Sequence, residues 1–334
     1  MSHAERRRAP LPALAVLLLC GWAEVACAQG TAGPAVTYPN RPVRVAVGFA
    51  PGGGVDIMAR AVSQKLSETL GKTFVVENRP GAGGTAAYAA LAKAPADGYN
   101  LLAISASYTM SSALHRNLPY DPVKDFAPIT LMGTAPYSIS THPSLPVRTV
   151  ADLIALAAAK PGVLNFASGG LGSAGHMTGE LFKSMARIQM TYVPYKGGEL
   201  ALVDLIAGQV QVVFTNLLTS LPHFRAGRIR LLAVTGTERH YSVPQIPTVM
   251  ESGLPGYSPV SWYGWLAPAG TPAAVVEKLN HEIAGLIRLR EVRERFARDG
   301  ADPVSSTPAE LGERIVSELA RWRKVVNEAN LRVE

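Results

Sequence analysis

The chemistry available to this sequence begins at a glycine-rich turn, residues 49–56, which follows a β-branched run and precedes a helical pattern. Its three consecutive glycines can adopt positive φ values, and they let a ligand approach main-chain N–H groups without meeting a Cβ atom. Those N–H groups and the positive end of the following helix form a natural site for an anion. An ordinary βα turn would have the same sequence, so this stretch alone leaves both interpretations open.

Comparable loops follow the other predicted strands, and they are rich in glycine, hydroxyl and amide groups. In an open parallel sheet, the loops after the carboxyl ends of the strands lie along one edge, and ligands bind there. Such an edge can bind a carboxylate without reacting with it. Asp56 is expected to orient the first loop and its helix rather than to touch an anion. The predicted ligand-binding residues are Phe49, Ala50, Pro51, Gly52, Gly53, Val55, Asp56, Gly81, Ala82, Ser105, Ser107, Ser168, Gly169, Gly172, Ser173, His176, Tyr195, Lys196, Gly197, Thr215 and Asn216.

A nucleotide cofactor is not expected, although Gly170-x-Gly172-x-x-Gly175 matches the dinucleotide-binding fingerprint. That fingerprint requires an acidic residue at the end of the next strand, where this sequence has Tyr195-Lys196. The phosphate-binding pattern Gly-x-x-x-x-Gly-Lys-Ser/Thr does not occur in the sequence.

Hydrolysis is the catalytic alternative, because Ser173 stands close to His176 in the sequence. The Gly-x-Ser-x-Gly nucleophile elbow is absent, since Leu171 stands two residues before Ser173. No third group is evident that would orient the histidine. The other histidines are dispersed without metal-ligand spacing. We therefore expect no metal and no enzyme, and an exported hydrolase using Ser173 and His176 stays open as the alternative.

The formal net charge of +7 suits a small anionic ligand or a plain solvated surface. Basic residues are scattered or have acidic neighbours, as in residues 288–298. Aromatic residues do not alternate with them, so nucleic-acid binding is not expected.

The first 28 residues have the pattern of a secretory signal peptide. Three arginines at positions 6–8 precede a short apolar core, and Ala26-Cys27-Ala28 supplies a small-x-small cleavage site. The apolar core is about half the roughly 20 residues that span a bilayer. Both cysteines would leave with the signal, and lipidation at one of them is an alternative. We therefore expect a periplasmic protein, secreted through a cleaved signal peptide.

The elements that must position the glycine loops alternate between strand and helix, which predicts an α/β fold with doubly wound, parallel sheets. The segment 129–140 is predicted to cross into a second unit near Ala135, and the segment 229–235 is predicted to return. Two lobes with flanking helices and two hinge crossings follow. The predicted division is a signal peptide at 1–28, one lobe at 29–134 plus 236–334, and a second lobe at 135–235.

Several long motifs make the sequence resemble the Bug/TctC family, the extracytoplasmic substrate-binding receptors of tripartite tricarboxylate transporters. The resemblance covers essentially the whole mature chain. The motifs are Tyr38-Pro39-x-Arg41-Pro42, Phe49-Ala50-Pro51-Gly52-Gly53-Gly54-x-Asp56, Glu77-Asn78-Arg79-Pro80-Gly81-Ala82-Gly83-Gly84, Ala96-Asp97-Gly98-Tyr99, residues 118–126, Val193-Pro194-Tyr195-Lys196-Gly197 and residues 266–272.

The resemblance implies a two-lobed periplasmic-binding-protein fold of type II, the Venus-flytrap arrangement. It implies a small carboxylate ligand held between the loops 49–56 and 168–176, and a membrane permease as partner. A monomer is expected, and a ligand sensor that docks to a signalling partner is a further alternative. The family often has Asp where this sequence has Thr215. We therefore expect a ligand whose distal end is neutral or acidic rather than an amine.

Overall fold

The computed structural model describes residues 38–328 and 331, except residue 116. These described residues form one compact unit. The predicted signal peptide lies outside the described residues, so its cleavage stays a prediction. Within the described residues, no helix combines the length and the apolar character that crossing a membrane would require.

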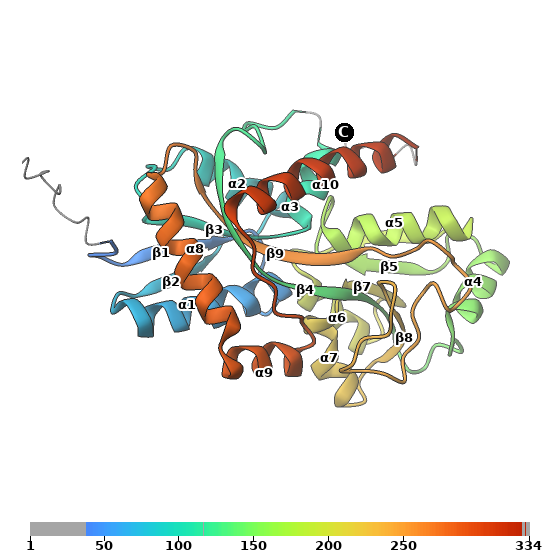
Figure 1. The fold of residues 1–334 in the computed structure, drawn as a ribbon. Helices are drawn as coiled ribbons and strands as arrows, with labels where there is room; N and C mark the ends of the chain where they lie inside the picture. Colours follow the sequence, from blue (N-terminus) through green and yellow to red (C-terminus); the bar gives the residue numbers. More distant parts are fainter. Residues whose placement is uncertain (1–37, 116, 329–330, 332–334) are drawn as a thin grey trace, which may run out of the picture. The chain divides into compact units, whose positions relative to one another are not determined.

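A mixed sheet of nine strands runs through this unit in the order β2-β1-β3-β9-β4-β7-β5-β6, with β8 paired to β4 (Figure 1). The strands are β1 Val43–Val47, β2 Phe74–Asn78, β3 Asn100–Ser105, β4 Phe126–Thr141, β5 Asn165–Ser168, β6 Thr191–Pro194, β7 Val212–Asn216, β8 Arg230–Val234 and β9 Val260–Pro268. The predicted α/β fold is confirmed, and pairing is parallel within the sets β2-β1-β3 and β6-β5-β7. The central strands β9 and β4 pair antiparallel with each other and with their neighbours, so the expectation of an all-parallel sheet is wrong there.

Strand β4 divides the sheet into two halves, because it changes partner along its length. Its residues 126–136 pair with β9, and its residues 137–141 pair with β7, while residues 138–141 also pair with β8. We call β2, β1, β3, β9 and the first part of β4 the first half, and the remaining strands the second half. The change of partner lies next to the predicted crossing at Ala135.

The second crossing lies later in the chain than the predicted return strand. That segment is β8, which pairs with β4 inside the second half. The linker that follows also packs there, since Val249, Leu254 and Tyr257 share one core cluster with Phe166 of β5. The chain therefore returns to the first half through β9. The lobe bounds 29–134 plus 236–334, and 135–235, stay a prediction.

Helices cover both faces of each half. They are α1 Gly54–Leu70, α2 Thr85–Ala92, α3 Ser107–Leu114, α4 Val150–Ala159, α5 Ala174–Ala186, α6 Gly198–Ile206, α7 Leu217–Arg225, α8 Ala273–Arg288, α9 Arg290–Asp299 and α10 Pro308–Glu328, with a 3-10 turn, η1, at Ala82–Gly84. In the first half, α1, α8 and α9 share one core with the sheet, and α2, α3 and α10 share another. In the second half, α4 and α5 cover one face, and α6 and α7 cover the other.

Local signals explain most of these helix ends. Gly71 ends α1 in the left-handed conformation, and Thr149 begins α4 with a capping box to Asp152. At the start of α2, Gly84 holds the cap position, and the Thr85 hydroxyl donates to the carbonyl of Ala82 at 2.9 Å.

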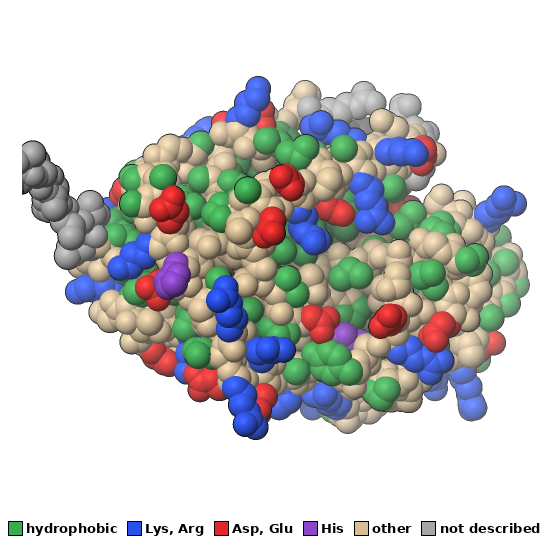
Figure 2. Space-filling model, in the orientation of Figure 1, with side chains coloured by type: hydrophobic (Ala, Val, Ile, Leu, Met, Phe, Trp, Pro, Cys, Tyr) green, Lys and Arg blue, Asp and Glu red, His purple; other side chains and the backbone are tan. Residues whose placement is uncertain are grey.

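The surface carries charges of both signs. On the face shown in Figure 2, Lys and Arg side chains lie interspersed with Asp and Glu. A solvated, mixed surface of this kind is the ordinary state of a globular protein.

Candidate functional site

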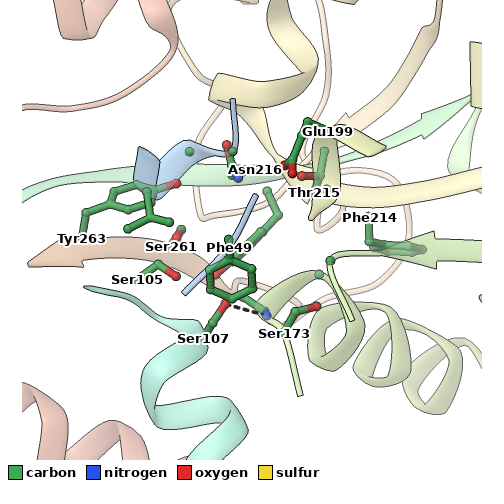
Figure 3. A pocket seen from close by; sticks show the side chains of 18 residues that line it. Phe49, Ser105, Ser107, Ser173, Glu199, Phe214, Thr215, Asn216, Ser261 and Tyr263 are labelled. Carbon is green, nitrogen blue, oxygen red and sulfur yellow. Dashed lines mark hydrogen bonds between the residues drawn. The ribbon is translucent and has the colours of Figure 1, made fainter. Parts of the chain in front are cut away.

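A cavity lies where loops of the first half meet loops of the second half (Figure 3). The space between its walls is about 450 Å³, a figure that includes space open to solvent. The lining residues are Phe49, Gly53, Gly54, Val55, Ser105, Ser107, Tyr137, Gly169, Ser173, Ala174, Gly175, Gly198, Glu199, Phe214, Thr215, Asn216, Ser261 and Tyr263. None of these lining residues is Lys, Arg or His.

Five helices begin at the cavity wall. The cavity is lined at the N-termini of α1, α3, α5, α6 and α7, by residues such as Gly54, Ser107, Ala174, Gly198 and Asn216. The first N–H groups of a helix have no partner within the helix, and the helix dipole places positive charge there. The wall therefore attracts an anion through main-chain groups, without a cationic side chain.

The first glycine loop needs its glycines because the second half approaches it closely. A Cβ atom on Gly54 would lie 2.5 Å from Asn216 Oδ1 and 2.6 Å from the Tyr263 hydroxyl. Gly52 has a φ of 87°, a value that favours glycine. Gly53 precedes α1 without a side-chain cap, which leaves the N-terminus of that helix open toward the cavity.

Asp56 organises this loop from behind and does not line the cavity. Its buried carboxylate accepts hydrogen bonds from the Gly52 N–H at 3.0 Å, from Arg60 Nε at 3.0 Å and from Asn78 Nδ2 at 2.8 Å. Each oxygen therefore has a donor within the chain, as expected for a residue that orients the loop.

Direct hydrogen bonds join the two halves beside the cavity. The Ser107 hydroxyl at the start of α3 accepts from the Ala174 N–H at the start of α5, at 2.9 Å (Figure 3). The N–H of Ala50 donates to the carbonyl of Lys196 at 3.3 Å. Pro51, Gly52 and the Lys196 side chain are exposed outside the cavity lining.

The second glycine loop supports the site from outside. Neither Gly81 nor Ala82 lines the cavity, and Ala82 is exposed. The neighbouring Gly83 instead packs on the loop of the second half, where a Cβ atom would lie 2.5 Å from the Leu171 carbonyl oxygen. This turn therefore packs the first half against the second, and contact of Gly81 and Ala82 with a ligand stays a prediction.

The loop 168–176 contributes Gly169 and Ser173 to the lining. Ser173 caps α5, because its hydroxyl accepts from the His176 N–H at 3.3 Å. Ser168 lies buried behind Ser173, at 3.2 Å between the hydroxyl oxygens. Gly172 packs against Ser111 of α3, where a Cβ atom would lie 2.9 Å from the serine Cβ.

His176 does not form a nucleophile–base pair with Ser173 among the described contacts. Its Nδ1 accepts from the Gly172 N–H at 3.3 Å, and its Nε2 lies 3.9 Å from Glu180. Burial, together with the charge of Lys183, lowers the pKa of His176 from 6.5 to about 4. The ring is therefore neutral near pH 7 and acts as a packed acceptor.

The segment 195–197 also turns away from the lining. The Tyr195 hydroxyl donates to Asp204 Oδ2 at 2.6 Å, which directs that side chain toward α6. Gly197 lies beneath the Glu199 side chain, where a Cβ atom would collide with the Glu199 carboxylate.

Half of the lining residues were not named from the sequence. Gly54, Ala174 and Gly175 lie within the predicted loops 49–56 and 168–176, whereas Tyr137, Gly198, Glu199, Phe214, Ser261 and Tyr263 lie outside both. Tyr137 comes from β4, which pairs with strands of both halves, and Ser261 and Tyr263 come from β9, so no loop motif marks these three residues. Glu199 did have a signal, because it is an acidic residue in the first turn of a helix directly after a glycine loop.

Glu199 is the carboxylate of the cavity. Neither of its buried carboxylate oxygens has a hydrogen-bond partner of good geometry among the described residues, although the N–H of Glu199 itself lies beside them. Burial raises its pKa from 4.5 to about 7, with the backbone N–H of Glu199 opposing the change and the charge of Asp56 adding to it. The hydroxyls of Tyr137 and Tyr263 are likewise buried without a partner of good geometry.

An α/β fold of two halves, with a cavity of convergent helix N-termini between them, defines a solute-binding receptor of the two-lobed class. Comparison with known proteins agrees: the chain belongs to the TctC family, described as "Tripartite tricarboxylate transporter family receptor", which it matches over residues 58–331. The predicted family resemblance is thereby confirmed.

Individual relatives cover nearly the whole chain. Protein BugT of Bordetella pertussis is 37% identical over 309 residues, which are 91% of this chain and 95% of that protein. The structure of R. palustris Rpa4515 with adipate is 38% identical, with a TM-score of 0.85 over 88% of this chain and 98% of that chain. The periplasmic binding protein BugD is 31% identical, with a TM-score of 0.85 over 89% of this chain and 100% of that chain.

Proposed function

We propose that this protein captures a small carboxylate in the cavity and delivers it to the membrane permease of a tripartite tricarboxylate-type transporter. The observation that carries the proposal is the convergence of five helix N-termini on a cavity whose lining has no cationic side chain. Main-chain N–H groups and helix dipoles favour an anion without supplying a nucleophile. The adipate bound by the similar Rpa4515 supports the same ligand class.

We further propose that the protein acts in the periplasm as a monomer, after removal of residues 1–28, and that it releases its ligand unchanged. The contacts of His176 support a binding role over hydrolysis, since its ring nitrogens face Gly172 and Glu180 rather than the Ser173 hydroxyl.

Isothermal titration calorimetry with a panel of carboxylates, each beside its uncharged amide, tests this function. We expect one-site binding of a carboxylate and no binding of its amide, such as adipate against adipamide, because only the carboxylate is stabilised by the helix N-termini. Mass spectrometry should recover the ligand unchanged. Failure of every carboxylate to bind, or conversion of the ligand, would contradict the proposal.

A glycine substitution connects this binding to the cavity. Gly53 has an extended backbone that valine can adopt, and its added Cβ would lie 3.0 Å from Glu199 Oε2 at the cavity wall. We expect Gly53→Val to weaken binding at least about tenfold, since the branched side chain fills space in front of α1. Gly285→Val on α8 is the matched control, because nothing lies within 4 Å of a Cβ there. Equal affinity in the two variants would place the ligand elsewhere.

A further inference from the structure

Glu199 is a carboxylate that the chain itself leaves unsatisfied. It stands in the first turn of α6, and its side chain folds over Gly197 toward Gly53, with Oε2 3.0 Å from the position of a Gly53 Cβ. Both oxygens are buried and lack a donor of good geometry among the described residues. Figure 3 shows the carboxylate at the cavity wall beside the labelled Asn216 and Thr215. A buried charge without a partner is costly, so its donor is to be sought in the ligand.

The charges around Glu199 do not supply that donor. On α1, Asp56 is negative and is already paired with Arg60. The strands β7 and β5, which pack against α6, contain no titratable side chain. On α7, His223 and Arg225 stand in the last turn, whereas Asn216 at the start of that helix lines the cavity. Lys196, in the loop before α6, is exposed, and Tyr137 and Tyr263 are the other titratable residues of the lining.

We propose that Glu199 selects the ligand, and that the ligand is a carboxylate that also bears a protonated amine, held by the Glu199 carboxylate. This inference rests on the proposed function. An ammonium group supplies both the positive charge and the several N–H donors that the two oxygens lack. The carboxylate of the same ligand then faces the N-termini of the other helices. The ligand class is therefore a small amino acid or a related zwitterion.

This assignment replaces the expectation drawn from Thr215. The absence of an acid at position 215 suggested a ligand without an amine, but Glu199 places a carboxylate in the same part of the cavity. A Cβ atom on the preceding residue, Gly198, would lie 2.3 Å from Thr215 Oγ1. In this chain the acidic group of the cavity stands in the first turn of α6 rather than at the end of β7.

Matched ligand pairs and one isosteric variant test the selection. Calorimetry compares glutamate with glutarate, and 2-aminoadipate with adipate, on the wild-type chain and on Glu199→Gln. We expect an amino ligand to bind the wild-type chain at least about tenfold more tightly than its deaminated partner, and Glu199→Gln to lose that preference. Glu238→Gln, which removes an exposed carboxylate outside this cavity, should retain the preference.

The pH dependence gives a second readout. An ammonium needs the ionised Glu199, whose pKa is raised to about 7 in the empty site. Lowering the pH from 8 to 5.5 should therefore weaken binding of the amino ligand to the wild-type chain at least about tenfold, because the fraction of protein molecules with an ionised Glu199 falls. Glu199→Gln should show no such fall, and its thermal unfolding should show that it is folded.

Each remaining outcome overturns the assignment. Tighter binding of the deaminated ligand, with affinity unchanged or improved in Glu199→Gln, would mean that a second carboxyl shares a proton with Glu199. In that case the carboxylate-binding function would stand, and only the proposal that the ligand bears an amine would be contradicted. If neither member of any pair bound the wild-type chain, the proposed function and this inference would fail together.

Discussion

At the scale of single residues, two carboxylates near the first glycine loop have opposite environments. Asp56 receives donors from Gly52, Arg60 and Asn78, whereas Glu199 receives none of good geometry from the described residues. A buried carboxylate that accepts hydrogen bonds stabilises the loop around it, whereas a buried carboxylate without such bonds destabilises the ligand-free protein. The same residue type therefore serves structure at one position and recognition at the other.

Glu199 should make the empty protein less stable as the pH rises. In the unfolded chain its carboxyl ionises near 4.5, whereas in the folded chain it holds its proton until about pH 7. Between these values the folded state binds more protons than the unfolded state, so the free energy of unfolding falls with increasing pH. The full change corresponds to about 3 kcal/mol.

Urea unfolding of the wild-type chain and of Glu199→Gln, without ligand, measures this effect. We expect similar stabilities at pH 4.5 and a growing advantage for the variant up to pH 8, reaching at most about 3 kcal/mol. All other titrating groups are common to both proteins, so the difference isolates Glu199. Parallel pH profiles would show that the carboxyl is not buried as described.

At the scale of elements, regular strands and well-capped helices were predictable, and atypical helices were not. The β-branched run before the first glycine loop forms β1 as predicted, and Thr149 and Asp152 cap α4 as their residue types favour. The sequence SYTMSSAL of α3 is rich in Ser and Thr, which compete for backbone hydrogen bonds and obscure a helix. Helix α7 contains Pro222, which argues against a helix locally. Both segments are helical because packing against the rest of the fold stabilises them.

These missed helices matter because both begin at the cavity. The predicted residues that line the cavity all lie in the strand end or loop before α1, α3, α5 or α7 or in the first turn of one of those helices. Residues such as Gly81 and Tyr195 serve contacts around the site, which a single sequence does not distinguish from contacts with a ligand. The lining residues of β4 and β9 could be predicted only from a knowledge of how these two strands pair.

The contact between α3 and α5 gives a prediction at this scale. Ser107→Ala removes the acceptor for the Ala174 N–H, and we expect a loss of about 1 kcal/mol in unfolding free energy together with weaker ligand binding. Ser111→Ala on the same helix is the matched control, since its buried hydroxyl has no partner in the described residues. It should be neutral or slightly stabilising. Equal effects of the two substitutions in urea unfolding and calorimetry would contradict the role of this contact.

At the scale of the whole molecule, two core clusters lie within the second half, and the two clusters of the first half also include Leu218 of α7 and Ala174 and Met177 of α5. The predicted crossing near Ala135 lies beside the point where β4 changes partner, and Gly133 and Pro136 interrupt an apolar segment there. The predicted return strand 229–235 contains β8, which pairs with β4 inside the second half. Only long-range pairing shows which half a short apolar strand joins.

Ligand binding should shift the molecule toward the arrangement described here, in which both halves contribute helix N-termini to one cavity. A ligand that touches both halves binds this arrangement more tightly than one in which they are separated, and it stabilises the closed population accordingly. Small-angle X-ray scattering should therefore give a smaller radius of gyration with a saturating ligand than without it. Gly53→Val at the same ligand concentration should stay near the ligand-free value, and Gly285→Val should follow the wild-type chain. An unchanged radius, despite binding measured by calorimetry, would mean that the two halves are already closed in the free protein.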